Sequence, residues 1–138
     1  MTWIIYALGS ALCAALVAIF GKIGLKNVDV TLATSIRSVV MAVFLVSVAF
    51  GLGKLKFVDS IDSKALTFIV LSGIAGALSW LCYFLALKIG PTSGVAALDR
   101  LSVVFVVIFA ALFLAESITW KTGLGALLIT GGALLFVI

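Results

Sequence analysis

Apolar residues follow one another along this chain in long, uninterrupted stretches, and short polar segments separate them. Five stretches are close to the 20 residues that a helix needs to cross the hydrocarbon core of a bilayer. They cover residues 2–20, 30–52, 65–87, 92–115 and 121–138. Because the runs are continuous, and polar positions do not alternate with apolar ones, they indicate spanning helices and not strands. We therefore expect an all-α membrane protein, with a bundle of five transmembrane helices in a single domain over residues 1–138.

The short polar segments contain residues that start and stop helices. Asp62 or Ser63 is suited to cap the helix that begins near residue 65. Gly90 and Pro91, the only proline in the chain, separate the third apolar stretch from the fourth. Trp120, at the start of the fifth stretch, is placed like an anchor at the membrane interface. These residues therefore support the same five helices.

The composition agrees with a lipid environment. Of the 138 residues, 65% are hydrophobic and only 10% are charged, whereas a soluble domain carries roughly a quarter charged residues. The net charge is +4, and the lysines flank the apolar stretches, where we expect them to meet lipid headgroups and not nucleic acid. The first stretch begins without a basic segment, which predicts a retained helix and not a cleaved signal peptide. The expected location is the cell (inner) membrane, crossed several times.

Residues that carry enzyme or metal chemistry are scarce. The chain has no histidine, which is the commonest general base and metal ligand. Cys13 and Cys82 lie far apart in the sequence, without the spacing of a metal site. No nucleophile–base pair, metal cluster or phosphate-binding loop is recognisable. We therefore expect no enzyme activity, no metal and no cofactor.

The lysine distribution leaves the orientation in the membrane open. Five spans place the two termini on opposite sides of the bilayer. The loops on the N-terminal side hold four lysines and those on the other side hold three, namely Lys54, Lys56, Lys64 and Lys121 against Lys22, Lys26 and Lys88. An excess of basic residues normally faces the cytoplasm, but a difference of one lysine gives almost no preference for either orientation. Either the first helix decides the orientation, or the chain inserts both ways round.

Three charged residues interrupt the apolar stretches at a similar depth. Arg37, Asp99 and Arg100 each lie about seven or eight residues from the same membrane side, or roughly 10 Å along a helix. Trp80 and Tyr83, on the stretch that runs in the opposite direction, lie close to this depth. An ionised group near the middle of a spanning helix costs about 2.5–3.5 kcal/mol, so such groups usually face a bundle interior or a watery cavity.

Two interpretations of these charges stay open. Asp99 and Arg37 can form a buried ion pair that joins two helices, or the charges can line a polar cavity for a substrate or a proton. Desolvation makes buried ion pairs weak devices for stability, which favours the cavity. Adjacent helix positions are about 100° apart, so Asp99 and Arg100 cannot point the same way. We expect Asp99, with Ser102 following it on its face, to face the cavity.

Small residues mark candidate contact faces. Gly125 and Gly132, seven positions apart, share a face of the last helix, and Gly131 lies beside them. Small residues let helix backbones approach closely in lipid. The glycines can serve packing within the chain or the seam of a dimer.

The second half of the chain resembles a known transporter repeat. The segment "ALKIGPTSGVAALDRLSVVFVVIFAALFLAESITWKTGLGALLITGGALLF" resembles the second half of an EamA-type domain of the drug/metabolite transporter superfamily, with Gly90, Pro91, Glu116 and the closing glycine-rich helix in the matching places. The segments "LSWLCYFLALKIG", "AIFGKIGLK" and "ATSIRSVVM" are similar to earlier parts of the same domain. The likeness covers nearly the whole chain.

The resemblance implies an assembly. Usual members of the superfamily carry two five-helix repeats in opposite orientations, and this chain has one, which makes it half of a ten-helix inverted-repeat transporter. The small multidrug resistance relatives rebuild such a fold by antiparallel dimerisation. The resemblance therefore implies a dual-topology homodimer, in which the last helix contributes to the seam. The chain lacks the membrane glutamate of the small multidrug group in its first helix, so cation/proton antiport is not carried over.

The leading hypothesis is a secondary transporter of a small organic metabolite with alternating access. Asp99 would be the proton-linked or substrate-linked carboxylate, Arg37 and Arg100 its charge partners, and Trp80 and Tyr83 the walls of the pocket. Arginines and aromatic surfaces favour an anionic or zwitterionic substrate over a bare cation. The alternative is a non-transporting membrane subunit that requires a different partner chain.

Overall fold

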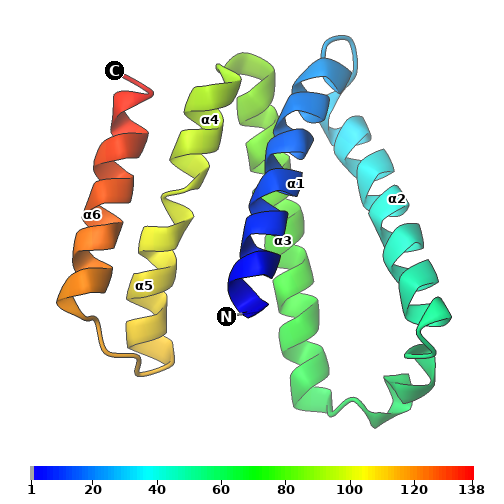
Figure 1. Ribbon diagram of the computed structural model, residues 1–138. Coiled ribbons are helices and arrows are strands. Elements are labelled where there is room, and N and C mark those ends of the chain that lie inside the picture. Colours follow the sequence, from blue (N-terminus) through cyan, green and yellow to red (C-terminus); the bar gives the residue numbers. More distant parts are fainter. Residues whose placement is uncertain (1) are drawn as a thin grey trace. The chain divides into compact units, whose positions relative to one another are not determined.

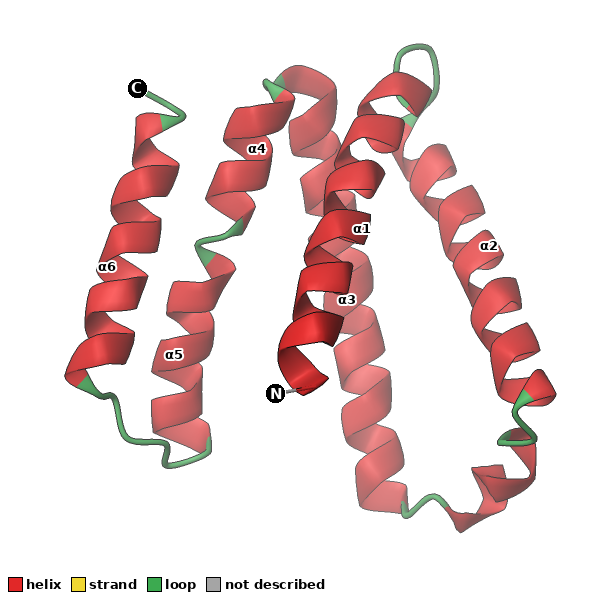
Figure 2. Ribbon diagram, viewed as in Figure 1, coloured by secondary structure: helices red, strands yellow, loops and turns green. Residues whose placement is uncertain are grey.

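The computed structural model describes residues 2–138, and every regular element in that range is helical (Figures 1 and 2). The prediction of an all-α chain is confirmed. The elements in chain order are α1 (Thr2–Gly24), α2 (Val30–Gly51), the short 3₁₀-helix η1 (Leu55–Ser60), α3 (Ser63–Ile89), α4 (Thr92–Asp99), α5 (Ser102–Phe113) and α6 (Trp120–Leu135).

Four stretches within residues 2–138 are long and apolar enough to cross a membrane. They are α1, α2, α3 and the combined α4–α5 stretch, Thr92–Phe113. The helix α6 is apolar but has only 16 residues, or about 24 Å at 1.5 Å per residue, against about 30 Å for the hydrocarbon core. The chain is therefore a multi-pass membrane protein, and a fifth span stays a prediction.

Two polar residues define helix starts. Asp29 precedes α2, and its carboxylate accepts the N–H of Leu32 at 3.0 Å. Thr119 precedes α6 and forms a reciprocal capping box with Thr122. Each cap satisfies backbone N–H groups that have no partner inside the helix.

The helices fall into two compact units. One consists of the described part of Met1–Phe20 together with Ile89–Ile138, and the other of Gly21–Lys88.

Two lysines join helix ends within the unit Gly21–Lys88. The ammonium group of Lys22 donates to the carbonyl of Leu87, near the C-terminus of α3. The ammonium group of Lys88 donates at 2.9 Å to the carbonyl of Val28, in the loop before α2. The last carbonyls of a helix lack intrahelical donors and carry partial negative charge, so Lys22 compensates the end of α3. Leu25 and Leu87 are buried beside these bonds.

In the other unit, α6 packs along both α4 and α5 (Figure 1). The backbones of α4 and α6 approach closely at Gly94, where a Cβ atom would lie 3.4 Å from the carbonyl oxygen of Phe136 and 3.3 Å from the ring of Pro91. Gly94 and Ala133 are buried at this contact. Small residues therefore bring α4 and α6 together.

Candidate functional site

The fourth apolar stretch is interrupted at its charged residues. A continuous helix over residues 92–115 was expected, but α4 ends at Asp99 and α5 begins at Ser102. Around the break, four amides donate to the carbonyl three residues earlier, as in a 3₁₀-helix, and they belong to Arg100, Leu101, Val103 and Val104. Asp99 and Ser102 are weak helix formers, because their short polar side chains compete for backbone groups. The fourth predicted span is therefore present over Thr92–Phe113, with a turn at Arg100 and Leu101 between α4 and α5.

The break frees backbone carbonyl groups. The N–H of Arg100 bonds to Ala97 in place of Ala96, and the N–H of Val103 bonds to Arg100 in place of Asp99. The carbonyls of Ala96 and Asp99 thus lose the donors that a regular α-helix would give them. Freed backbone groups at membrane depth are tolerated where they are buried in protein or line a water-filled cavity.

A groove of about 370 Å³ lies between α4 and α6 and includes Arg100, the first residue of the break. Arg100 is the one charged residue that lines it, and the remaining walls are Ser93, Ala96, Ala97, Ile129, Ala133 and Phe136. The side chain of Arg100 is exposed and that of Asp99 is half-buried. Because Asp99 is not among the lining residues, its orientation into a cavity stays a prediction. Ser102 is exposed at the start of α5.

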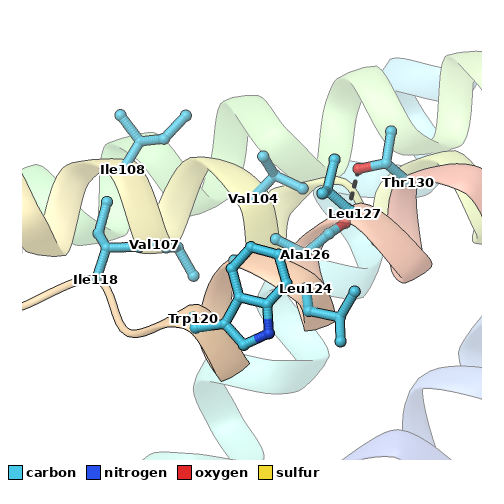
Figure 3. Close-up of a pocket in the computed structure, with 10 residues that line it drawn as sticks. Val104, Val107, Ile108, Ile118, Trp120, Leu124, Ala126, Leu127 and Thr130 are labelled. Atoms are coloured by element: carbon cyan, nitrogen blue, oxygen red, sulfur yellow. Dashed lines mark hydrogen bonds between the residues drawn. The ribbon is translucent and has the colours of Figure 1, made fainter.

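A second pocket of about 320 Å³ lies between α5 and α6 and is apolar (Figure 3). Val104, Ile108 and Trp120 belong to its walls. The hydroxyl of Thr130 donates at 2.8 Å to the carbonyl of Ala126 in its own helix, so it has no free donor for a solute. This pocket suits an acyl chain better than a polar metabolite.

In the unit Gly21–Lys88, Arg37 of α2 lies on an aromatic surface of α3. Its guanidinium carbon is 3.7 Å from the centroid of the Trp80 ring and 5.2 Å from that of Phe84. A cation over an aromatic face is attracted by the ring quadrupole, by about 2 kcal/mol when desolvated. The contact confirms that Arg37 and Trp80 lie at the same level, as the sequence indicated. Their role in a substrate site stays a prediction.

Three aromatic residues of α3 form the surface that carries Arg37. The rings of Trp80 and Phe84 stack, with centroids 5.6 Å apart, and Tyr83 meets both edge-on at 5.7 and 5.9 Å. Positions three and four residues apart lie on the same helix face. Sequence reasoning selected Trp80 and Tyr83 but missed Phe84, although its spacing of four residues from Trp80 was the available signal.

The end of α1 is close to this aromatic group. A Cβ atom at Gly21 would lie 2.4 Å from Cε1 of Phe84, a distance that no unstrained contact allows. Phe84 itself is only 4% exposed. Gly21 therefore lets α1 approach α3 and helps to fix the ring that lies beside Trp80. Sequence reasoning did not select Gly21 for this role.

The remaining predicted residues lie at open positions or in separate units. Gly125 is half-buried, while Gly131 and Gly132 are exposed, and a Cβ atom at any of the three would meet nothing within 4 Å. Their role in a dimer seam stays a prediction. Arg37 and Asp99 belong to different units, and an ion pair between them also stays a prediction.

Comparison with known proteins agrees with the helical membrane architecture. The model of the EamA-like transporter family matches residues 1–138. A protein of Sinorhizobium sp, named "Uncharacterized transporter in cobO 3'region", is 40% identical over 137 residues, which cover 99% of this chain and 97% of that protein. No solved structure matches. The chain belongs to the EamA-like transporter family.

Proposed function

We propose that the protein is a secondary transporter of a small organic metabolite across the cell membrane, and that it works by alternating access as an antiparallel, dual-topology homodimer. The observation that carries the proposal is the interruption of the fourth span at Asp99 and Arg100. Many transporters build their solute sites at discontinuous helices near the bilayer midplane, where unwound backbone and charged groups meet the solute. The family membership supports transport as the general activity.

Each residue of the proposed site has a distinct task. Asp99 couples transport to a proton or to the substrate. Arg37 and Arg100 supply positive charge, and the ring face of Trp80 with Tyr83 forms a wall. Ser102 adds a hydroxyl at the start of α5.

The homodimer rests on three observations. The family match occupies residues 1–138, which we interpret as one five-helix repeat, and the Sinorhizobium relative is matched over 97% of its length. The lysine counts on the two predicted sides are almost equal, which permits insertion in both orientations. Gly125, Gly131 and Gly132 leave a face of α6 with room for a neighbouring helix. Two oppositely inserted copies would then form an inverted-repeat structure.

Orientation mapping tests the dimer. Cys13 and Cys82 are free and exposed, so both are first replaced by alanine. A single cysteine is then placed at the exposed Ser60 in η1, or at Ile138. Labelling of each cysteine from both sides of intact cells is the expected result. Labelling from one side alone would remove the antiparallel dimer.

Uptake by the purified protein tests transport. Proteoliposomes are incubated with a mixture of cellular metabolites, and mass spectrometry identifies the solutes that accumulate. Specific accumulation is expected with this chain alone. A purified protein that folds but accumulates nothing would instead indicate a subunit that needs a different partner chain.

A further inference from the structure

The arrangement of Arg37 on Trp80 leaves the edge of its guanidinium group available. The guanidinium carbon is in van der Waals contact with the ring face, 3.7 Å from the centroid. Such a contact satisfies the positive charge through the ring but uses none of the five N–H donors, which point outward in the plane of the group.

Nothing else in the unit takes up these donors. Within residues 21–88, no hydrogen bond of the structure involves the Arg37 side chain. Across the described chain, every fully buried side-chain nitrogen or oxygen has a partner. The nitrogens of Arg37 therefore reach the surface of their unit, where an incoming group can bind them.

The unit also lacks an acid at this level. Its acidic residues are Asp29, Asp59 and Asp62. Asp29 caps α2 and lies eight residues before Arg37, about 12 Å away along the helix. Asp59 and Asp62 follow the far end of α2. An unneutralised arginine at this depth is costly, so a negative group from elsewhere has much to gain by binding there.

We propose that Arg37, held on the face of Trp80, binds a carboxylate group of the transported solute through the edge of its guanidinium. A carboxylate is planar and accepts two parallel hydrogen bonds from the guanidinium fork, a bidentate geometry that a lysine ammonium in place of the arginine would not offer. Phe84 and Tyr83 fix the indole, so the fork is set before the solute arrives. The inference rests on the proposed transport function and names the substrate class, a carboxylic acid.

Tryptophan fluorescence provides the test. The chain contains three tryptophans, and Trp3 and Trp120 are 71% and 82% exposed, so phenylalanine can replace both and leave Trp80 as the reporter. The full-length protein, in nanodiscs of phosphatidylcholine, is titrated with sodium acetate, benzoate and succinate. Benzamide, the neutral analogue of benzoate, is the matched control. A saturable change in Trp80 emission with at least one carboxylate, and none with benzamide, is expected.

Two variants separate charge from geometry. Arg37→Gln should weaken carboxylate binding at least about tenfold, and Arg37→Lys, which keeps the charge but loses the fork, should weaken it nearly as much. Circular dichroism confirms that each variant is folded. If Arg37→Lys binds as well as the parent, the fork is not used and the inference is wrong.

The remaining outcomes also decide the matter. No response to any of the three carboxylates, or equal responses to benzoate and benzamide, overturns the inference. A response that appears only when anionic phosphatidylglycerol replaces phosphatidylcholine, and that carboxylates do not displace, would assign Arg37 to lipid phosphate instead. Carboxylate binding without transport would overturn the proposed function alone, and transport by a protein that ignores carboxylates would overturn this inference alone.

Discussion

Asp99 is the acidic residue that the fourth span carries inside the membrane, and at the scale of single residues it separates the two interpretations of the buried charges. Asp99→Asn keeps the shape of the side chain and removes its charge. If Asp99 couples transport, the variant should fold normally and lose at least about tenfold in uptake rate, which corresponds to ~1.4 kcal/mol of barrier. Uptake into proteoliposomes, normalised to folded protein, provides the measurement.

The matched control for Asp99 is Asp59→Asn, which removes an exposed carboxylate from η1 and should leave uptake unchanged. The alternative interpretation, in which Asp99 belongs to a structural ion pair, predicts a different result for Asp99→Asn. In that case Asp99→Asn would unfold the protein, because it would leave a buried cation without its partner. The molecules that still fold would then transport at the parent rate.

The addition of one methyl group at Gly21 should destabilise the protein. A Cβ atom there would lie 2.4 Å from the ring of Phe84, and Phe84 is held between neighbours. Overpacking of this kind costs about 1–3 kcal/mol. Gly21→Ala should therefore lower the thermal unfolding temperature in detergent and shift the emission of Trp80. Gly24→Ala, in the same helix and with nothing within 4 Å of its Cβ, should do neither.

At the scale of elements, the interruption between α4 and α5 should be visible in hydrogen exchange. Bonds to the carbonyl three residues earlier have poorer geometry than regular helical bonds. The amides of Arg100, Leu101, Val103 and Val104 should exchange at least about tenfold faster than those of Val106–Ile108, because their local opening costs less. Mass spectrometry with fragmentation in nanodiscs resolves the two groups.

Ser102→Ala provides a matched variant for the exchange experiment. Alanine is the strongest helix former and removes a side chain that competes for the backbone, so the variant should narrow the difference between the two groups of amides. Uniform protection across residues 97–110 in the parent protein would show that the interruption has no dynamic consequence.

The positions of the helices could be predicted from the sequence better than the irregularities within them. Long apolar runs and residues such as Pro91 located the helices within a few positions, because a spanning helix must satisfy its own backbone. The break after Asp99 could not be predicted from the sequence, because no proline or glycine marks it. The change from α-helical to 3₁₀ hydrogen bonding depends on small differences in local free energy. Counting residues from the predicted helix ends placed Arg37 at the depth of Trp80. The roles of Phe84 and Gly21 depend on which helices lie side by side, and the sequence alone does not show this.

At the scale of the whole molecule, the near-equal lysine counts make the orientation sensitive to small changes. Lys54→Ser with Lys56→Ser and Lys64→Ser reduces the N-terminal side from four lysines to one, against three on the other side. Lys26→Ser reduces the other side from three to two, against four. All four side chains are exposed, so their removal should leave folding intact. The two variants should therefore insert in opposite and nearly uniform orientations, because basic loops stay in the cytoplasm.

The oppositely biased variants allow a complementation experiment. If the active form is an antiparallel pair, either variant expressed alone should lose most of its uptake activity, because few copies meet a partner of opposite orientation. Their coexpression should restore activity toward the parent level, and cysteine labelling at position 60 should show both orientations again. A parallel dimer or a monomer would behave otherwise: the variant that inserts in the natural orientation would keep full activity alone, and coexpression would add nothing. The requirement for two orientations thus becomes a measurable property of the pair, independent of which solute is carried.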